Sequence, residues 1–227
     1  MNRFLKLFQL AALLVFCYGV QVGEASAAPK SINSCQTINN SGSYILTKNL
    51  TAIGNCLVVG ADNVTIDLDG WTISGNGTGS GITDGGAGRK NIAIRNGVIT
   101  NFDVGIGFFS TSSGCVVERV RASQNNTAGI VAGRRAIVRD SIASGNGGIG
   151  IFGLMGSLVT GNVAFDNTTT GLYAEVGVTL SNNTSSFNAT GILAVCPSNV
   201  IGNTAIDNSS SNYAYAGVGC GNNHNIP

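Results

Sequence analysis

The chain is poor in the residues that several functional classes require. Only 10% of its 227 residues are charged and the formal net charge is +1, which excludes nucleic-acid binding through clustered positive charge. There is one histidine, His224, and no Cys-x-x-Cys pair, so a zinc site is not expected. After residue 28 no run approaches the ~20 apolar residues of a membrane-spanning helix. We therefore expect no nucleic-acid partner, no metal or other cofactor, and no membrane insertion of the mature chain.

Glycine and asparagine are abundant, whereas proline is scarce. The sequence contains 33 Gly, 26 Asn and 3 Pro. These residues divide the chain into many short runs rich in β-branched side chains. Such a composition favours short strands joined by tight turns.

Residues 1–27 have the pattern of a secretory signal peptide. Arg3 and Lys6 give a positive start, residues 7–20 are mostly apolar, and Ala25-Ser26-Ala27 is a cleavage site of small residues. An uncleaved membrane anchor is the alternative, but the apolar stretch is short for one. We expect a secreted or periplasmic protein.

Export makes disulfide bonds possible. The mature chain would hold five cysteines, and an odd number leaves at least one free thiol or an intermolecular bond. We expect two local pairs, Cys35 with Cys56 and Cys196 with Cys220, one near each end. Cys115 lies in an apolar run and is expected to be a small buried hydrophobic residue.

The middle and end of the chain repeat with a period of 21 residues. Residues 115–135, 136–156 and 157–177 are three repeats of equal length. The asparagines of the repeat are Asn101, Asn125, Asn146, Asn167, Asn188 and Asn208. A Gly followed by Ile or Leu comes three or four residues after nearly every one of them.

A period near 21 excludes helical solenoids, whose repeats are longer, and the leucine-rich skeleton is absent. We predict an all-β fold, a single-stranded right-handed parallel β-helix with coils stacked at ~4.8 Å. Equivalent residues then form columns, in which Asn side chains bond to one another and Gly permits turn angles closed to other residues. We expect an N-terminal cap at 28–62, about seven coils at 63–216 and a loose tail at 217–227.

Alternation along the strands assigns the faces. The first inward set is Val64, Ile66, Ile92, Ile94, Cys115, Val117, Ala136, Val138, Ser157, Val159, Val178 and Leu180. The second is Ala122, Ala143, Ala164 and Ser185, and the third is Ile106, Ile130, Ile151, Leu172 and Ile192.

Residues 63–70, Asn-Val-Thr-Ile-Asp-Leu-Asp-Gly, and 91–97, Asn-Ile-Ala-Ile-Arg-Asn-Gly, resemble the opening coils of bacterial secreted right-handed β-helix repeat proteins. The broader superfamily contains pectate lyases, polygalacturonases, mannuronan C5-epimerases and periplasmic NosD-type proteins. The resemblance implies carbohydrate binding or sugar hydrolysis. The catalytic signatures are missing: the Asp-Pro-His-Asp run of the epimerases and the Gly-His-Gly of the polygalacturonases have no counterpart, and the carboxylates that would hold calcium in a pectate lyase are scattered.

Charged residues of alternating sign follow the inward positions. Asp67, Arg95, Glu118 and Arg139 should form one outward column, which Thr160 and Ser181 continue. We favour a cross-strand charge ladder, because neighbouring charges of opposite sign satisfy one another at about 0.2–1 kcal/mol per pair. The alternative is a catalytic site with Asp67 and Asp69 as carboxylates and Arg95 as base or oxyanion partner.

Two further groups are candidates for substrate binding. Arg119, Arg121, Arg134 and Arg135 are predicted to form a basic cluster that could hold an acidic polysaccharide, and a solvated turn is the alternative.

Phe152 and Tyr173 should stack on an outward face, between Val131 and Leu193. Such a stripe could carry sugar rings, or it could be a dry contact with a loop or a second subunit.

The sequence favours a secreted β-helix protein that binds polysaccharide along its side face, without an evident catalytic centre. One alternative is a polysaccharide lyase, epimerase or hydrolase with a divergent site near Asp67, Asp69, Arg95 and Arg119. Another is a structural surface protein that self-assembles through its apolar stripe.

Overall fold

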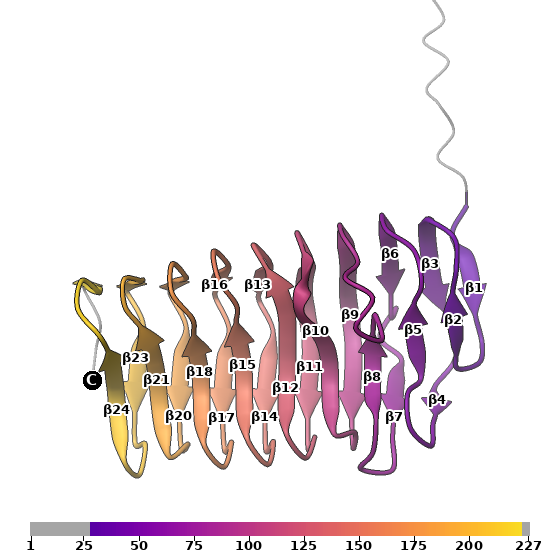
Figure 1. Ribbon diagram of the computed structural model, residues 1–227. Coiled ribbons are helices and arrows are strands. Elements are labelled where there is room, and N and C mark those ends of the chain that lie inside the picture. Colours follow the sequence, from indigo (N-terminus) through magenta and orange to yellow (C-terminus); the bar gives the residue numbers. More distant parts are fainter. Residues whose placement is uncertain (1–27, 224–227) are drawn as a thin grey trace, which may run out of the picture.

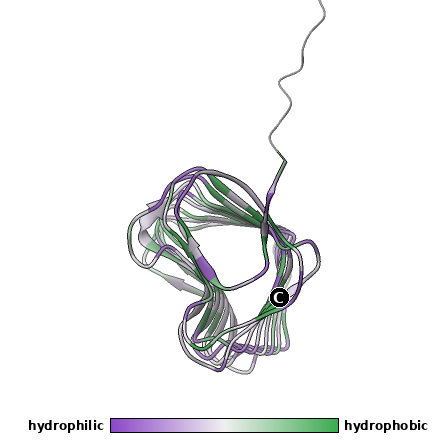
Figure 2. Cartoon of the chain, turned by 90° about the vertical axis from the view of Figure 1, so that its right-hand side faces the viewer, coloured by the Kyte–Doolittle hydropathy of each residue, from purple (hydrophilic) through white to green (hydrophobic). Residues whose placement is uncertain are grey.

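The computed structural model describes residues 28–223. In that range all regular structure is β-strand, and every strand pair is parallel. The strands belong to two sheets that wind about one axis (Figure 1). Viewed along the axis, the coils superpose on one another (Figure 2). The predicted signal peptide and His224 lie outside the described residues.

The larger sheet has 16 strands and forms two walls of the solenoid. The first wall consists of β1 (Lys30–Ile32), β3 (Gly42–Leu46), β6 (Val64–Asp67), β9 (Ile92–Thr100), β11 (Val116–Ser123), β13 (Ile137–Arg139), β16 (Leu158–Thr160), β19 (Thr179–Ser181), β22 (Asn199–Ile201) and β25 (Gly221–Asn223). The second wall consists of β4 (Leu50–Thr51), β7 (Thr72–Ser74), β14 (Ile142–Ser144), β17 (Val163–Phe165), β20 (Thr184–Ser186) and β23 (Thr204–Ile206), together with the second halves of β9 and β11.

The third wall is the sheet of 9 strands. It consists of β2 (Gln36–Ile38), β5 (Leu57–Val59), β8 (Ser80–Thr83), β10 (Val104–Ser113), β12 (Ala128–Arg134), β15 (Ile149–Gly153), β18 (Thr170–Ala174), β21 (Thr190–Val195) and β24 (Ser211–Ala216). About nine coils of ~21 residues therefore stack in register. The predicted fold, a single-stranded right-handed parallel β-helix, is confirmed.

The predicted inward columns form the core. All three sets are buried, and the strand register stacks their members coil upon coil, as in the column Ile106, Ile130, Ile151, Leu172 and Ile192. A side chain on one wall thus packs against equivalent side chains above and below it. Burial of these continuous apolar columns stabilises the stacked coils.

The Asn column forms a hydrogen-bonded ladder at the corner between the second and third walls. The side-chain amide of Asn125 donates to the Oδ1 atom of Asn146 at 3.0 Å, and that of Asn146 donates to Asn167 at 2.8 Å. Asn188 and Asn208 continue the ladder at 2.9 and 3.0 Å. The predicted column is confirmed from Asn125 onward.

The expectation that Asn101 begins this ladder is wrong. Asn101 has φ 60°, which is the left-handed turn position before the ladder. The backbone N–H of Phe102, a fully buried residue, donates to the Oδ1 atom of Asn125 instead. A spacing of 24 residues places Asn101 one position early, so the apolar Phe102 ends the ladder.

The glycines beside the ladder have a different role from the predicted one. None of Gly105, Gly129, Gly150, Gly171 and Gly191 has a positive φ. A Cβ atom on Gly150 would lie 2.6 Å from the carbonyl oxygen of Gly171 and 2.8 Å from the amide nitrogen of Asn167. These positions need Gly because the next coil approaches closely, not because of turn angles.

A second Asn ladder, which the sequence reading missed, lies at the corner between the first and second walls. Asn162 donates to Asn183 at 3.1 Å, and Asn183 donates to Asn203 at 2.9 Å. Its signal is also a period of 20–21 residues, but the neighbouring Asn residues of the first ladder masked it. Both ladders satisfy backbone N–H groups at the corners, where the strands do not pair.

The segment predicted to be the cap adds strands to the same sheets. β1 pairs with β3, β2 with β5, and β3 with β6, all in parallel. Residues 30–59 therefore extend all three walls toward the N-terminal end. Their covering role, and the domain boundaries at 62 and 216, stay predictions.

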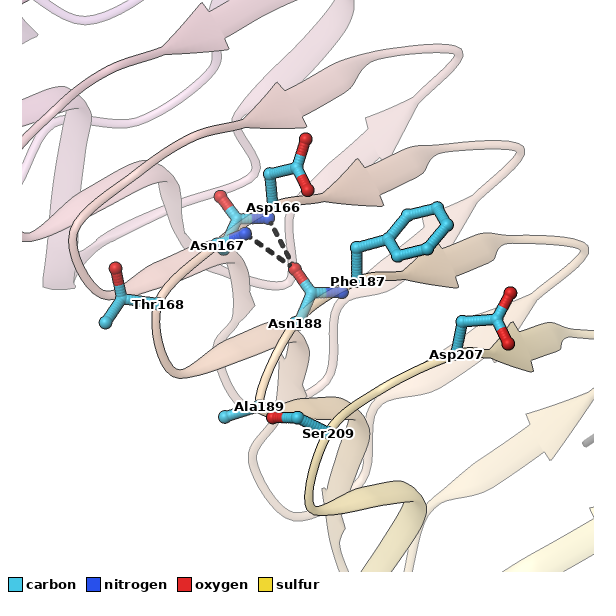
Figure 3. Close-up of a pocket in the computed structure, with 8 residues that line it drawn as sticks. All are labelled: Asp166, Asn167, Thr168, Phe187, Asn188, Ala189, Asp207 and Ser209. Carbon is cyan, nitrogen blue, oxygen red and sulfur yellow. Dashed lines mark hydrogen bonds between the residues drawn. The ribbon is translucent and has the colours of Figure 1, made fainter.

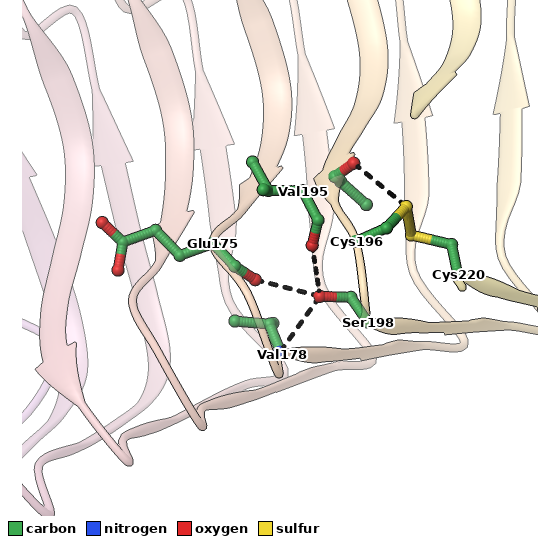
Figure 4. The surroundings of a disulfide bond; sticks show 7 residues. Glu175, Val178, Val195, Cys196, Ser198 and Cys220 are labelled. Carbon is green, nitrogen blue, oxygen red and sulfur yellow. Dashed lines mark hydrogen bonds between the residues drawn. A yellow bond between two sulfur atoms is a disulfide. The ribbon is translucent and has the colours of Figure 1, made fainter. Parts of the chain in front are cut away.

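Both predicted disulfides are present. Cys35 is bonded to Cys56, and Cys196 to Cys220, in each case across neighbouring coils. Figure 4 shows the second bond beside Ser198, whose Oγ atom lies 2.8 Å from the carbonyl oxygen of Val195 and 3.0 Å from that of Glu175, either of which can accept its proton. Cys115 is buried with a free thiol, as predicted, and burial raises its pKa to about 11, so the thiol is protonated and unreactive.

Candidate functional site

The charge column on the first wall has the predicted register. Asp67 pairs with Arg95, Arg95 with Glu118, and Glu118 with Arg139. The Nε atom of Arg95 lies 2.9 Å from Asp67, and Arg139 forms a close ion pair with Glu118. Further along, the Ser181 hydroxyl donates to Thr160 at 2.9 Å. The column is therefore a stack of polar side chains in which successive pairs are bonded.

The carboxylate of Asp67 is held by several donors. It accepts hydrogen bonds from the Asp69 backbone N–H at 3.0 Å, from Arg95, and from the Asn96 amide at 3.0 Å. Burial alone would raise the pKa of Asp67, but these bonds outweigh it and lower the pKa. Asp69 contributes its backbone and has φ 47°. An ionised, fully bonded carboxylate is a weak proton carrier, which favours the ladder over the acid/base alternative.

Glu118 is the most buried charge of the column, with 8% of its surface exposed. Burial raises its pKa, but the bond from Arg139 and the charge of Arg119 outweigh burial, and the pKa is lowered. Arg119 reaches Glu118 at 2.8 Å and the Oδ1 atom of Asn96 at 2.7 Å. Arg119 therefore belongs to the ladder and shares the Glu118 carboxylate with Arg139.

The four arginines do not form the predicted single cluster. Arg119 and Arg121 line a groove of about 350 Å³ at the start of the second wall, together with Asp140 of the next coil. Arg134 and Arg135 line a separate pocket of about 310 Å³ at the corner between the third and first walls. The Arg134 carbonyl accepts from the N–H of Gly114, which lies five residues, or about 16 Å along a strand, before Arg119. A period of 21 places Arg135 over Gly114 and not over Arg119. The prediction of a single arginine cluster is therefore wrong.

The pocket at this corner, here called the arginine pocket, is lined by hydroxyls and guanidinium groups. Its walls are Ser110, Thr111, Ser112 and Ser113 on one side, and Arg134, Arg135, Met155 and Gly156 on the other. Arg134 and Arg135 are exposed and have no ion pair among the described residues. Unpaired guanidinium groups next to hydroxyls can bind carboxylate or sulfate groups bidentately.

Asp84 organises the turn beside this pocket, and the sequence reading did not identify it. Its carboxylate, 2% exposed, accepts from the backbone N–H groups of Gly86 and Gly88 at 2.9 Å and from the Ser112 hydroxyl. Burial raises its pKa, but these donors outweigh burial and lower it. The Asp-Gly-Gly sequence at 84–86 was a turn signal, but nothing in it indicated that the carboxylate points inward.

The predicted aromatic stripe lies on the outer face of the third wall. Phe152 and Tyr173 are register partners, and their ring centroids are 4.6 Å apart at an interplanar angle of 78°. Val131 and Leu193 flank them, as expected. Val131 and Leu154 belong to a small apolar cluster, separate from the core, against which Phe152 packs.

The aromatic stripe and the arginine pocket are linked along the chain. Leu154 of the outer cluster is followed directly by Met155, which lines the pocket and is 47% exposed. Phe109, also 47% exposed, directly precedes the pocket residue Ser110. A single surface thus combines half-buried aromatic rings with exposed guanidinium and hydroxyl groups.

The described residues offer neither a cluster of metal ligands nor a membrane-spanning helix. Residues 28–223 contain no group of three His, Cys, Asp or Glu side chains arranged to hold a metal ion. In the same part of the chain, no helix is long and apolar enough to cross a membrane.

Comparison with known proteins identifies the fold alone. No protein-family model and no curated protein matches the chain. Among solved structures, it is similar to the A-module of the Azotobacter vinelandii mannuronan C-5 epimerase AlgE4, with a TM-score of 0.53, 16% identity, and coverage of 75% of this chain and 70% of that chain. The A-module of AlgE6 from the same organism (TM-score 0.44, 17% identity, 75% and 69% coverage) is a more distant neighbour. So is XylC in complex with xylose (TM-score 0.49, 10% identity), of which this chain covers 36%.

Proposed function

We propose that this protein binds an acidic polysaccharide on the surface formed by the aromatic stripe and the arginine pocket. The observation that carries the proposal is that the wall bearing Phe152 and Tyr173 leads, through Leu154 and Met155, to two exposed guanidinium groups. Neither guanidinium group has an ion pair within residues 28–223. Pyranose rings have apolar faces that stack on aromatic side chains. Uronate or sulfate groups on the same chain would bind Arg134 and Arg135.

The extended wall of the solenoid favours a polymer over a small molecule as the ligand. The stripe runs across coils and continues into the pocket, so several sugar units would contact it at once. Each contact can be weak, because neighbouring units raise the effective concentration of the next. We propose that the protein acts outside the cytoplasm, where its two disulfides would persist.

Affinity electrophoresis and titration calorimetry with polygalacturonate and alginate test this proposal. We expect Arg134→Ala and Arg135→Ala each to weaken binding about tenfold, because each removes a charge-assisted contact. Lys48→Ala removes an exposed charge far from the pocket and serves as the charge-matched control. Tyr173→Ala should weaken binding several-fold, whereas Trp71→Ala removes an aromatic side chain that is 37% exposed elsewhere and should not.

Several outcomes would contradict the proposal. Equal losses of affinity in Lys48→Ala and Arg135→Ala would show that the polymer is held by non-specific charge attraction. A wild-type protein that binds neither polygalacturonate nor alginate would contradict the proposed function. Release of new chain ends would favour the enzyme alternative, and a dimer that dissociates in Tyr173→Ala during sedimentation would favour self-assembly.

A further inference from the structure

A groove at the corner between the second and third walls combines an exposed aromatic ring with two carboxylates. Phe187 stands in this groove with Asp166 on the coil before and Asp207 on the coil after it, and the groove holds about 430 Å³. In Figure 3 these three side chains leave the corner on one side, whereas Thr168 and Ser209 leave it on the other. We call this surface the Phe187 groove.

Phe187 has a backbone conformation that is more favourable for the Asp residues at the equivalent positions of the neighbouring coils. Asp166, Phe187 and Asp207 have φ values of 55°, 56° and 54°. Asp tolerates this left-handed conformation, whereas a bulky aromatic residue there is an outlier. Phe187 is also 60% exposed, so burial does not compensate for the unfavourable conformation. An aromatic side chain that gains neither backbone preference nor burial points to a ligand.

The corner beneath the groove is rigid. Asn167 donates to Asn188 at 2.9 Å, a bond drawn in Figure 3, and Asn188 donates to Asn208 at 3.0 Å. Each of these residues directly follows one of the three groove residues. The ladder therefore fixes the backbone from which the ring and both carboxylates project, and an ordered backbone lowers the entropy cost of binding.

The spacing of the groove fits one sugar ring. Successive coils are ~4.8 Å apart, so Asp166 and Asp207 lie about 10 Å apart with Phe187 midway. Neither carboxylate has a hydrogen bond or ion pair within residues 28–223, and both residues are exposed. A pyranose stacked on the ring would place its hydroxyl groups toward both carboxylates, which are strong acceptors. A uronate in the same place would be repelled by both.

We propose that the Phe187 groove binds an uncharged pyranose unit, with its ring stacked on Phe187 and its hydroxyl groups donating to Asp166 and Asp207. This site is separate from the acidic-glycan surface and has the opposite charge preference. The protein would thus hold two chemically different polysaccharides, one on the third wall and one at this corner.

The test is titration calorimetry of the protein with three probes: cellohexaose, xylohexaose and hexagalacturonate. We expect at least one neutral hexasaccharide to bind, with Phe187→Asn weakening that binding about tenfold or more. Phe187→Trp should keep or strengthen it. Asp166→Asn and Asp207→Asn keep the turn and should each weaken binding several-fold.

A stability measurement separates a binding role from a structural one. Asn tolerates a positive φ, so Phe187→Asn should keep or raise the melting temperature, by up to about 4 °C. A folded Phe187→Asn variant that still binds the neutral sugar as tightly as the wild type would overturn the proposal. So would a wild-type chain that binds neither neutral hexasaccharide.

The two sites can be tested independently. Phe187→Asn should leave polygalacturonate binding unchanged, and Arg135→Ala should leave neutral-sugar binding unchanged. If either variant lost both polygalacturonate binding and neutral-sugar binding, the assignment of two sites would be overturned.

Discussion

At the residue scale, the corners of the solenoid depend on fully bonded amides. Asn167 donates to Asn188 and to the Ala143 carbonyl at 3.1 Å, and it accepts bonds from the backbone and side chain of Asn146. It is 2% exposed. Removing one such side chain leaves buried donors and acceptors above and below it without partners.

We predict that Asn167→Ala destabilises the protein by about 2–4 kcal/mol, because a buried backbone N–H, an amide and a carbonyl each lose a partner. Urea unfolding measures the loss. Thr168→Ala changes the exposed neighbour and should cost less than about 0.5 kcal/mol. Equal losses in the two variants would show that the ladder does not stabilise the corner.

Sequence reasoning identified the Asn column at this scale because its period is regular. It misjudged the role of the glycines, because a close approach by the next coil cannot be read from one coil. Gly150 is required by the position of the Gly171 carbonyl oxygen, 2.6 Å from a Cβ atom built on it. It also missed Asp84, whose bonding partners lie in its own turn and at Ser112.

At the element scale, one column of charges links four strands of the first wall. The period of the sequence was sufficient to predict it, because parallel strands in register stack equivalent residues. The same rule separates Arg135 from Arg119, since only residues about 21 apart meet. The prediction of one cluster rests on their lying one coil apart, but the register of β11 and β13 places the two pairs at opposite ends of a strand.

The charge column makes the free energy of unfolding depend on pH. The pKa of Glu118 in the folded protein lies below its ordinary value of 4.5. As the pH falls, the unfolded chain therefore takes up its proton first. The stabilisation is complete above about pH 5 and is lost as the pH falls through the lowered pKa.

We predict that the free energy of unfolding of the wild type falls between pH 6 and pH 3, and that Glu118→Gln reduces this fall. At pH 7 the variant should be less stable by about 1–3 kcal/mol, because Arg139 and Arg119 lose a charged partner. Denaturant unfolding at both pH values provides the comparison. Parallel pH profiles for the two proteins would contradict the ladder.

At the scale of the whole molecule, each coil contacts its neighbours along the axis. The stability of such a solenoid is close to a sum over coils, and its ends open first. The two disulfides lie at these ends and join neighbouring coils, as Figure 4 shows for Cys196 and Cys220.

We predict that Cys196→Ser/Cys220→Ser loosens the C-terminal coils without unfolding the centre. The loop that this bond closes is worth about 3 kcal/mol in the chain-entropy model. Hydrogen exchange should become faster in β21–β24 and stay unchanged in β11 and β12. Uniformly faster exchange along the chain would show that the molecule unfolds as one cooperative unit.

The sequence by itself determined the repeat, the three inward columns and the charge column, because each follows from a period that parallel stacking turns into contact. It also determined both disulfides, because the two cysteines of each pair are close in sequence and lie near one end of the chain. Only the tertiary structure decided which corner each irregular residue occupies. It joined the aromatic stripe to Arg134 and Arg135, separated these from Arg119 and Arg121, and placed Phe187 between two carboxylates. The physical reason is that coils differ by one or a few residues at their turns. A shift of one position at a corner changes which surface a side chain reaches.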